Sequence, residues 1–293
     1  MNEANFQYPH DADREIFQEA LAYSEATTGF TANLIEKDYY CSLILQHFFD
    51  KNTSLVFKGG TCLSKIYADF YRLSEDLDFI IPVTVDTTRK QRRSEIAPVN
   101  AVFDGLPAFV PGLTVSGAFR GHNESRQYIG SFEYKSAVID KQERIILEVG
   151  LREPLLSPAV SMPARTIVVN PFSSRPLFPI LTVRAMAETE AYAEKVRAAL
   201  SRREPAIRDF FDLLYAVRKM GLDFHNPDFL RIVKTKLEVP GNTSVDISAD
   251  RKRELNRQLE GQLKPVLRPV DFAGFNLDEA FELVCGIAEA VSI

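Results

Sequence analysis

A Gly-Gly pair, which follows a short apolar run and precedes a helical stretch, is the feature that most limits how this chain can fold. The run Leu55–Phe57 is typical of a strand, and Gly59-Gly60 comes directly after Lys58. Because neither glycine has a Cβ, the backbone can turn tightly there and come close to a ligand. The helix that begins near Thr61 would direct unpaired N–H groups to the same place, where they favour an anion. We therefore expect a strand, a tight turn and a helix able to receive a phosphate, although most such turns bind nothing.

An acidic strand follows the predicted helix. Asp76 and Asp78 stand at the beginning of an apolar run that ends near Val83. Residues i and i+2 of a strand point to the same face, so the two carboxylates would lie side by side. Carboxylate oxygens suit Mg²⁺ or Mn²⁺, and substrate phosphates commonly complete the coordination of Mg²⁺. The alternative is an exposed acidic turn, because Glu75 precedes the pair.

A further acid stands alone in another strand-like run. Glu148 is the sole acid in the apolar stretch Ile145–Val149. A lone acid in a buried strand requires a partner or a metal, because an unpaired charge is costly to bury. Asp140 and Glu143 are rivals for this role, and both lie in a polar turn. The preferred metal-binding set is therefore Asp76, Asp78 and Glu148.

Composition excludes several other classes of protein. The chain has 293 residues and a net charge of −5, enough for one large domain or two ordinary ones. Its three cysteines form no Cys-x-x-Cys pair, and its four histidines are scattered, which argues against a disulfide framework or a zinc site. No apolar run is long enough to cross a bilayer, and no signal-like segment opens the sequence. We therefore expect a cytoplasmic protein.

The order of the predicted elements indicates an α+β protein with two parts. Strands are expected at 55–57, 78–83, 113–115, 128–134, 144–149 and 165–169, with helices at 13–50, 61–71 and 86–110. After residue 182 the pattern is helical, with candidates at 185–200, 205–219, 228–237, 250–263 and 277–291. We expect a mixed α/β domain over 1–180 and a helical domain over 181–293.

Two motifs in the helical part carry further candidates. Lys195 lies in the predicted helix 185–200, and Arg208-Asp209 opens the next helix. Asp209 and Asp212, at i and i+3, share a helix face, and their simplest role is ordinary ion pairing on the helix surface. The same part of the chain is rich in cations that could follow an RNA backbone, or could form a solvated, ion-paired surface. These cations are Arg197, Arg202, Arg203, Lys234, Lys236, Arg251, Lys252 and Arg253.

Taken together, the motifs resemble a known family. A Gly-rich turn, a helix and an Asp-x-Asp strand are typical of the DNA polymerase β-like nucleotidyltransferases. Within that superfamily the chain resembles the AbiEii/AbiGii-type toxins, the toxin component of type IV toxin–antitoxin systems. The resemblance rests on five segments, which are 35–39 (IEKDY), 58–61 (KGGT), 72–78 (RLSEDLD), 194–198 (EKVRA) and 208–213 (RDFFDL).

The resemblance implies a role for each matched residue. A polymerase β-like domain with a mixed sheet would hold the catalytic residues, and the C-terminal helices would complete the cleft. Asp76, Asp78 and Glu148 would bind two divalent metals, Mg²⁺ or Mn²⁺. Lys195 would contact the triphosphate, and Asp209 would order the second catalytic helix pair. The remaining residues expected to bind the nucleotide are Lys58, Gly59, Gly60, Thr61, Ser74 and Arg208.

The resemblance also implies an activity and partners. Such proteins transfer a nucleotide from an NTP, and some relatives act on tRNA 3′ ends, so an RNA acceptor and an antitoxin from an adjacent gene are expected. A phosphate on Ser74 would obstruct the metal site, although a turn cap is the simpler role for this residue. The alternatives are a protein or small-molecule acceptor, or an inactive scaffold that only binds a partner.

Overall fold

The computed structural model describes residues 8–51 and 53–292, and its centre is a mixed sheet of seven strands. The strand order is β3-β4-β5-β2-β1-β7-β6. β2 pairs in parallel with β5 and β1 pairs in parallel with β7, whereas the other neighbours are antiparallel. The strands are β1 (Val56–Lys58), β2 (Leu77–Ile80), β3 (Thr114–His122), β4 (Gln127–Lys135), β5 (Gln142–Gly150), β6 (Val160–Ala164) and β7 (Leu181–Ala185).

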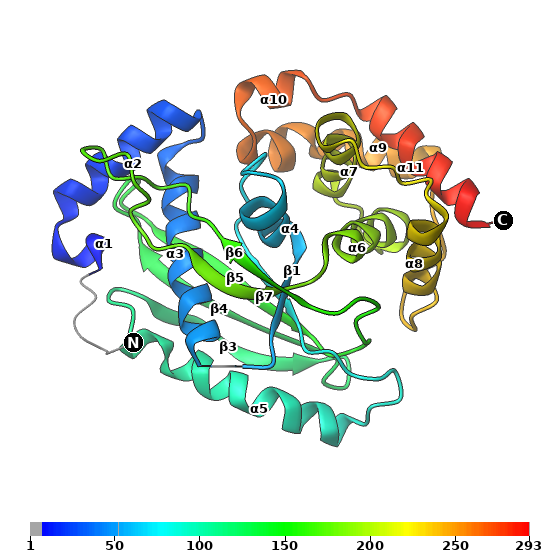
Figure 1. Cartoon of the computed structure of the whole chain (residues 1–293), viewed down its shortest axis with the longest axis horizontal. Coiled ribbons are helices and arrows are strands. Elements are labelled where there is room, and N and C mark those ends of the chain that lie inside the picture. The colour runs from blue at the N-terminus through cyan, green and yellow to red at the C-terminus, as the bar shows by residue number, and fades with distance from the viewer. Residues whose placement is uncertain (1–7, 52, 293) are drawn as a thin grey trace.

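Helices flank this sheet on both sides (Figure 1). The first group is α1 (Pro9–Ala12), α2 (Arg14–Thr28), α3 (Ala32–Asp50) and α5 (Arg89–Gly105), and the short α4 (Gly59–Cys62) follows β1. The second group comprises α6 (Glu188–Ser201), α7 (Ile207–Met220), α8 (Pro227–Leu237), α9 (Ala249–Gln258), α10 (Pro269–Ala273) and α11 (Leu277–Ser292). In the described ranges no helix is both long and apolar enough to cross a membrane.

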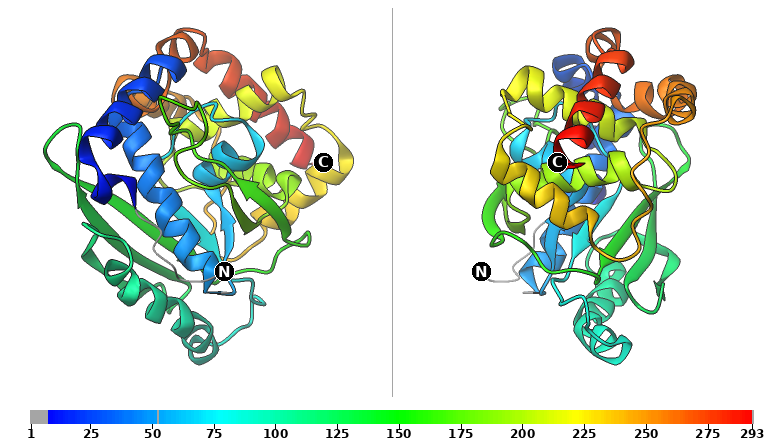
Figure 2. Two further views of the ribbon diagram at one scale, coloured as in Figure 1. Left: turned by 60° about the vertical axis from the view of Figure 1, so that its left-hand side comes forward. Right: turned by 90° about the vertical axis from the view of Figure 1, so that its right-hand side faces the viewer.

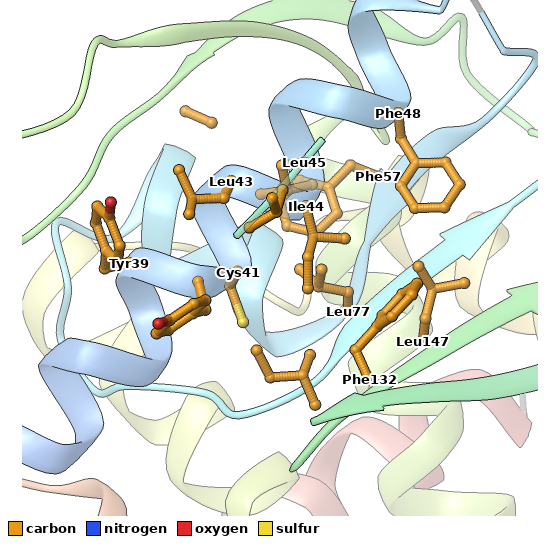
Figure 3. Close-up of a cluster of buried hydrophobic side chains, with 14 of the residues drawn as sticks. Tyr39, Cys41, Leu43, Ile44, Leu45, Phe48, Phe57, Leu77, Phe132 and Leu147 are labelled. Carbon is orange, nitrogen blue, oxygen red and sulfur yellow. The ribbon is translucent and has the colours of Figure 1, made fainter. Parts of the chain in front are cut away.

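Helix α3 forms the centre of the first hydrophobic core. Its side chains are buried almost all round, from Leu34 to Phe48. Figure 3 shows Leu45 and Phe48 of this helix gathered with Phe57, Leu77 and other apolar side chains of the sheet. A helix buried on all sides needs apolar neighbours in every direction, and α2, α5 and the sheet supply them.

The sheet separates this core from a second one, and strand alternation decides which residue faces which side. Phe57 and Phe79 belong to the core around α3, whereas Val56 and Ile80 pack with residues of the C-terminal helices. Successive side chains of a strand point to opposite faces. Lys58 and Asp78 therefore point to the side of the C-terminal helices, which is why polar residues interrupt these apolar strands.

The α+β class and the C-terminal helices were predicted correctly, but the strands β6 and β7 were not. The predicted strand 165–169 is wrong: β6 lies at Val160–Ala164, and Val169 forms only an isolated bridge with Pro176. Pro163 is tolerated within β6 because this strand is at the edge of the sheet. The strand β7 was missed, since its residues precede helix α6 and were assigned to a helical region.

The helix predicted over 61–71 is also shorter than expected. α4 continues as a π-helix over Leu63–Tyr67, and the helix stops there. Asp69 and Phe70 have φ of 46° and 52°, a left-handed conformation that breaks the helix and turns the chain towards β2.

Candidate active site

The Gly-Gly turn is confirmed as a place of close approach between backbone and side chains. Gly59 has φ of +80°, and a Cβ there would lie 2.3 Å from Oδ2 of Asp78. A Cβ on Gly60 would lie 2.4 Å from Nη2 of Arg72 and 3.2 Å from Oγ of Ser74. Both glycines are therefore required, because any side chain would displace the acid or the guanidinium that packs against them.

Three charged side chains stand next to one another on adjacent strands. Asp78 is the register partner of Lys58 on β1 and of Glu148 on β5. Residues paired in this way project to the same face of a sheet. Asp76 precedes β2 by one residue, and its Oδ1 accepts a hydrogen bond of 3.3 Å from the Ile146 N–H. The sheet thus brings the three predicted carboxylates to one region of one face.

Burial disfavours the ionised forms of Asp76 and Asp78. Burial and, to a smaller extent, the neighbouring charge of Glu148 together raise the pKa of Asp78 to about 6, against the opposing effect of Lys58. Burial also raises the pKa of Asp76, although the Ile146 N–H and the charge of Arg208 oppose this shift. A bound cation would relieve both shifts, because it favours the ionised carboxylates.

The carboxylate oxygens are suitable ligands for a divalent cation, but they are not arranged around one point in this structure. Within residues 8–51 and 53–292, no three His, Cys, Asp or Glu side chains are gathered closely enough to form a ready metal site. Asp76 is instead bonded to the backbone of β5, while Asp78 and Glu148 repel each other. The oxygen donors nevertheless suit Mg²⁺ or Mn²⁺, whose coordination substrate phosphates and water can complete.

Helices α6 and α7 provide the opposite wall through a buried ion-pair network. Nζ of Lys195 lies 2.7 Å from Oδ1 of Asp209 and 2.9 Å from Oδ2 of Asp212. Arg72 donates two hydrogen bonds to Asp212, of 2.5 and 2.8 Å, and Asp212 is completely buried. Burial acts to raise the pKa of Asp212, but Arg72 and Lys195 hold it well below its usual range. Asp209 and Asp212 therefore do more than pair on a helix surface: they fix Lys195 and connect it through Arg72 to the Gly60 turn.

A second ion-pair cluster surrounds Glu194, which was not predicted as a site residue. Lys58 lies 3.6 Å and Arg152 3.9 Å from Oε1 of Glu194, and Arg197 contacts it at 2.8 Å. Burial acts to raise the pKa of Glu194, but Arg197 and Lys58 keep it well below its usual range. Glu194 pairs with Arg197 at i+3, but its contacts with Lys58 and Arg152 link residues distant in sequence, so no local spacing indicates them. The same holds for the contact of Arg72 with Asp212.

These walls enclose a cavity of about 730 Å³. Thr61 does not line it: the side chain is only 1% exposed, and its hydroxyl donates a 2.5 Å hydrogen bond to the Asp76 carbonyl. The expected contact of Thr61 with a triphosphate is therefore replaced by a structural one that fixes the residue before β2. All the other predicted site residues line the cavity: Lys58, Gly59, Gly60, Ser74, Asp76, Asp78, Glu148, Lys195, Arg208 and Asp209.

The predicted RNA-binding surface on the C-terminal helices is mostly occupied by internal pairs. Lys236 is buried between Glu153 and Glu190, at 3.2 and 2.7 Å. Arg251 is buried and donates to the carbonyls of Ala199 and Arg202. Further members of the set are also paired, Arg197 with Glu194, Lys252 with Asp278 and Arg253 with Asp250. Six of the eight cations thus form internal ion pairs, as the ion-paired alternative expected, and RNA binding by this surface stays a prediction.

Comparisons with known proteins agree with this fold. The chain is similar in structure to MenT4, a nucleotidyltransferase toxin from Mycobacterium tuberculosis H37Rv, with a TM-score of 0.55 and 19% identity over 94% of this chain and 98% of that one. It is also similar to JHP933 from Helicobacter pylori, with a TM-score of 0.50 and 14% identity over 89% and 93% of the two chains. No curated protein matches it in sequence. The model of the family described as "Nucleotidyl transferase AbiEii toxin, Type IV TA system" matches residues 43–283, and the chain belongs to this family.

Proposed function

We propose that this protein transfers a nucleotide from an NTP to an RNA acceptor, the 3′ end of tRNA. Asp76, Asp78 and Glu148 would hold two divalent metals, Mg²⁺ or Mn²⁺, for this reaction. The observation that carries the proposal is the register of Asp78 with Glu148 directly beside the Gly59 turn. The Gly59-Gly60 turn and the three carboxylates line one cavity there.

Different residues of the cavity would contact the triphosphate in different ways. Gly59 and Gly60 let the phosphates approach the backbone, and the cations Lys58 and Arg208 line the same cavity. Phosphoryl transfer depends on positioning and charge neutralisation more than on covalent help from the protein. When bound, the divalent metals would supply charge neutralisation at the phosphates and activation of the acceptor hydroxyl.

Lys195 would act as a fixed positive charge opposite the carboxylates. Burial acts to lower the pKa of Lys195, but Asp209 and Asp212 raise it above its usual value, so the ammonium stays protonated. A cation held by two buried acids does not have to reorganise when negative charge develops on the leaving phosphates. The reaction joins the acceptor's hydroxyl oxygen to the α-phosphorus, breaks the bond to the β-phosphate oxygen and releases pyrophosphate.

The family also suggests the setting of this reaction. A type IV system pairs a toxin with an antitoxin, so we infer that an antitoxin encoded by an adjacent gene opposes this activity in the cytoplasm. Expression of the protein alone should then slow growth, and co-expression of the neighbouring gene should restore it. Normal growth without the neighbour would contradict the toxin role.

The decisive test is transfer of label from each NTP, labelled at the α-phosphate, to total cellular RNA. Wild-type protein with Mg²⁺ should label RNA, and Asp78→Asn or Glu148→Gln should abolish the label, since each removes a negative charge from the metal site. Glu133→Gln is a matched control, because this acid lies on the same sheet opposite Arg144 and outside the cavity lining. Undiminished transfer by Asp78→Asn would refute the assignment. Label found in protein or small molecules instead of RNA would favour the alternative acceptors.

A further inference from the structure

A row of side chains crosses the sheet on the face that carries the proposed metal site. The strand register aligns one residue from each of five neighbouring strands, which are Lys58 (β1), Asp78 (β2), Glu148 (β5), Ile129 (β4) and Arg120 (β3). Residues aligned in this way project to the same face of a sheet. Neighbouring strands lie about 4.8 Å apart, so the Cα atom of Arg120 lies about 10 Å beyond that of Glu148. The carboxylates of the proposed metal site therefore have a cation on either side.

The two ends of this row would receive different substrates. At the β1 end, Lys58 precedes the Gly59 turn, where the triphosphate is proposed to bind. In phosphoryl transfer the attacking oxygen and the leaving oxygen lie roughly in line, on opposite sides of the phosphorus. With the leaving pyrophosphate beside β1, the acceptor hydroxyl approaches from the side of Glu148, β4 and β3. The order of the strands thus places the acceptor on this side of the carboxylates.

The C-terminal helices leave this part of the sheet uncovered. Among the described residues, the core that they share with the sheet contains residues of β1 and β2 and none of β3, β4 or β5. Ile146, two residues before Glu148 on the same face of β5, is 37% exposed. Helix α5 packs on the opposite face, where its Phe103 contacts Phe132 and would lie 2.6 Å from a Cβ on Gly130. Figure 2 shows α5 at the far end of the molecule from α11. A surface beside the catalytic cavity is therefore open to a large ligand.

The turn between β3 and β4 extends this surface to the catalytic cavity. Gln127 pairs with the β5 residue that follows Glu148 by two positions, so both side chains belong to the same face. Gln127 and Arg126 line the cavity. The carbonyl of Arg126 accepts a 2.7 Å hydrogen bond from the Leu151 N–H, so the backbone at Arg126 is fixed to the end of β5. We call Arg120, Arg126 and Gln127 the acceptor-side surface.

The two arginines of the acceptor-side surface are available to a ligand. Arg120 is exposed, and within residues 8–51 and 53–292 its side chain forms neither an ion pair nor a hydrogen bond. Among the described side chains, Arg126 pairs only with Glu124, at 4.0 Å, and both of these side chains are exposed. An exposed pair at this separation contributes little and is readily exchanged for a phosphate. By contrast, most cations of the C-terminal helices are held by internal acids.

We propose that the acceptor-side surface binds the 3′ strand of the acceptor RNA and leads its terminal hydroxyl to Glu148. This inference rests on the proposed function, in which the acceptor is RNA. Arg120 and Arg126 would pair with backbone phosphates, which planar guanidinium groups bind in a bidentate manner. The amide of Gln127 can both donate to and accept from a base edge or a ribose hydroxyl. RNA is favoured over an acidic protein because the surface is continuous with the cavity in which the acceptor hydroxyl must react.

The test measures binding of labelled bulk tRNA to the full-length protein by fluorescence anisotropy, without NTP. Arg120→Ala/Arg126→Ala should remove two phosphate contacts, and each contact contributes about 0.7 to 0.9 to the slope of log K against log salt. The loss of affinity between ~50 and ~200 mM salt should therefore shrink by about tenfold. Arg120→Lys/Arg126→Lys should keep the wild-type slope, because it keeps the charges. The affinity of the alanine variant for NTP without RNA should equal that of the wild type, because both arginines lie on the acceptor side of the carboxylates.

A matched control is Arg89→Ala/Arg93→Ala on α5, which removes the same two charges from exposed side chains. Neither arginine forms an ion pair with the described part of the chain, and α5 packs on the face of the sheet opposite to the carboxylates. This control should keep the wild-type slope.

The outcomes separate this inference from the proposed function. An unaltered slope in Arg120→Ala/Arg126→Ala, or an equal change in the α5 control, would overturn the acceptor-side surface even where wild-type protein labels RNA. Wild-type protein that neither binds nor labels RNA would instead refute the proposed function itself. Normal tRNA binding by the alanine variant together with escape from the antitoxin would show that an acidic protein occupies this surface.

Discussion

Replacing Glu148 with glutamine should abolish transfer and at the same time stabilise the metal-free protein. Asp78 and Glu148 are neighbours on adjacent parallel strands, and the pKa of Asp78 is raised to about 6 by burial and by the charge of Glu148. Without a cation, the two carboxylates repel each other at neutral pH. Removing one charge relieves this repulsion. The two charges that the proposed metal site needs therefore lower the stability of the metal-free protein.

The size of the effect follows from the pKa. The shift from 3.8 to about 6 corresponds to roughly 3 kcal/mol, at about 1.36 kcal/mol per unit. Burial is the larger cause, so the charge of Glu148 accounts for the smaller share, about 1 kcal/mol after screening by solvent. Coulomb's law agrees, since two charges about 4.8 Å apart repel by about 1 kcal/mol in water and about 3 kcal/mol at an effective dielectric constant of ~20.

The pH dependence supplies the sign of the effect. As the pH falls through about 6, Asp78 takes up a proton in the folded protein, whereas in the unfolded chain it stays ionised down to its ordinary value of 3.8. The wild-type protein therefore gains stability on acidification, and the advantage of Glu148→Gln shrinks. Mg²⁺ should stabilise the wild-type protein more than the variant, because only the wild type retains all the carboxylates of the proposed site.

The assay is thermal unfolding with and without a chelator, at about pH 7.5 and about pH 5. A gain of about 1 kcal/mol should raise Tm of the variant by about 2 to 4 °C in chelator at the higher pH. The control Glu133→Gln should show no gain, because Glu133 lies opposite Arg144. This reasoning would be refuted if the variant had a lower Tm than the wild type at the higher pH. It would also be refuted if the Tm difference between variant and wild type were the same at both pH values.

Two further substitutions test other parts of the site. Gly59→Ala should abolish nucleotide transfer and lower Tm, because its φ of +80° costs about 1 to 3 kcal/mol for alanine and its Cβ would strike Asp78; wild-type kinetics would contradict the close approach. Asp212→Ala should destabilise the protein by about 3 to 5 kcal/mol in denaturant unfolding, because Arg72 loses its buried partner and Lys195 one of two. A loss below about 1 kcal/mol would show that water replaces the carboxylate.

The features of this site that depend on a few neighbouring residues could be predicted from the sequence. The Gly-Gly turn, the Asp76-x-Asp78 spacing and the lone acid at Glu148 each follow from chain conformation over a few residues. Their meeting on one sheet face required the register of β2 with β5, which links residues 70 positions apart. The family resemblance implied only a third carboxylate on a neighbouring strand, because alternation alone gives neither strand order nor register.

The contacts between the two walls were not predictable in the same way. Arg72 and Asp212 are 140 residues apart, and nothing in either segment identifies its partner. The strand β7 was missed for a related reason: its five residues form a strand because β1 and β6 pair with it, not because of a strong local pattern. Likewise, Lys236 and Arg251 have the composition of surface cations, and only the packing of α8 and α9 buries them.

The core shared by the sheet and the C-terminal helices has a consequence for turnover. Val56, Leu63 and Ile80 are fully buried in the same cluster as residues of α6, α7 and α11. Separating the walls would expose these three side chains at a cost of roughly 1.5 to 3 kcal/mol each. Hinge opening that separates the two walls is therefore unfavourable. Under the proposed function, nucleotide would enter and pyrophosphate would leave through the existing mouth of the cavity, and side chains at that mouth would set the rate of exchange.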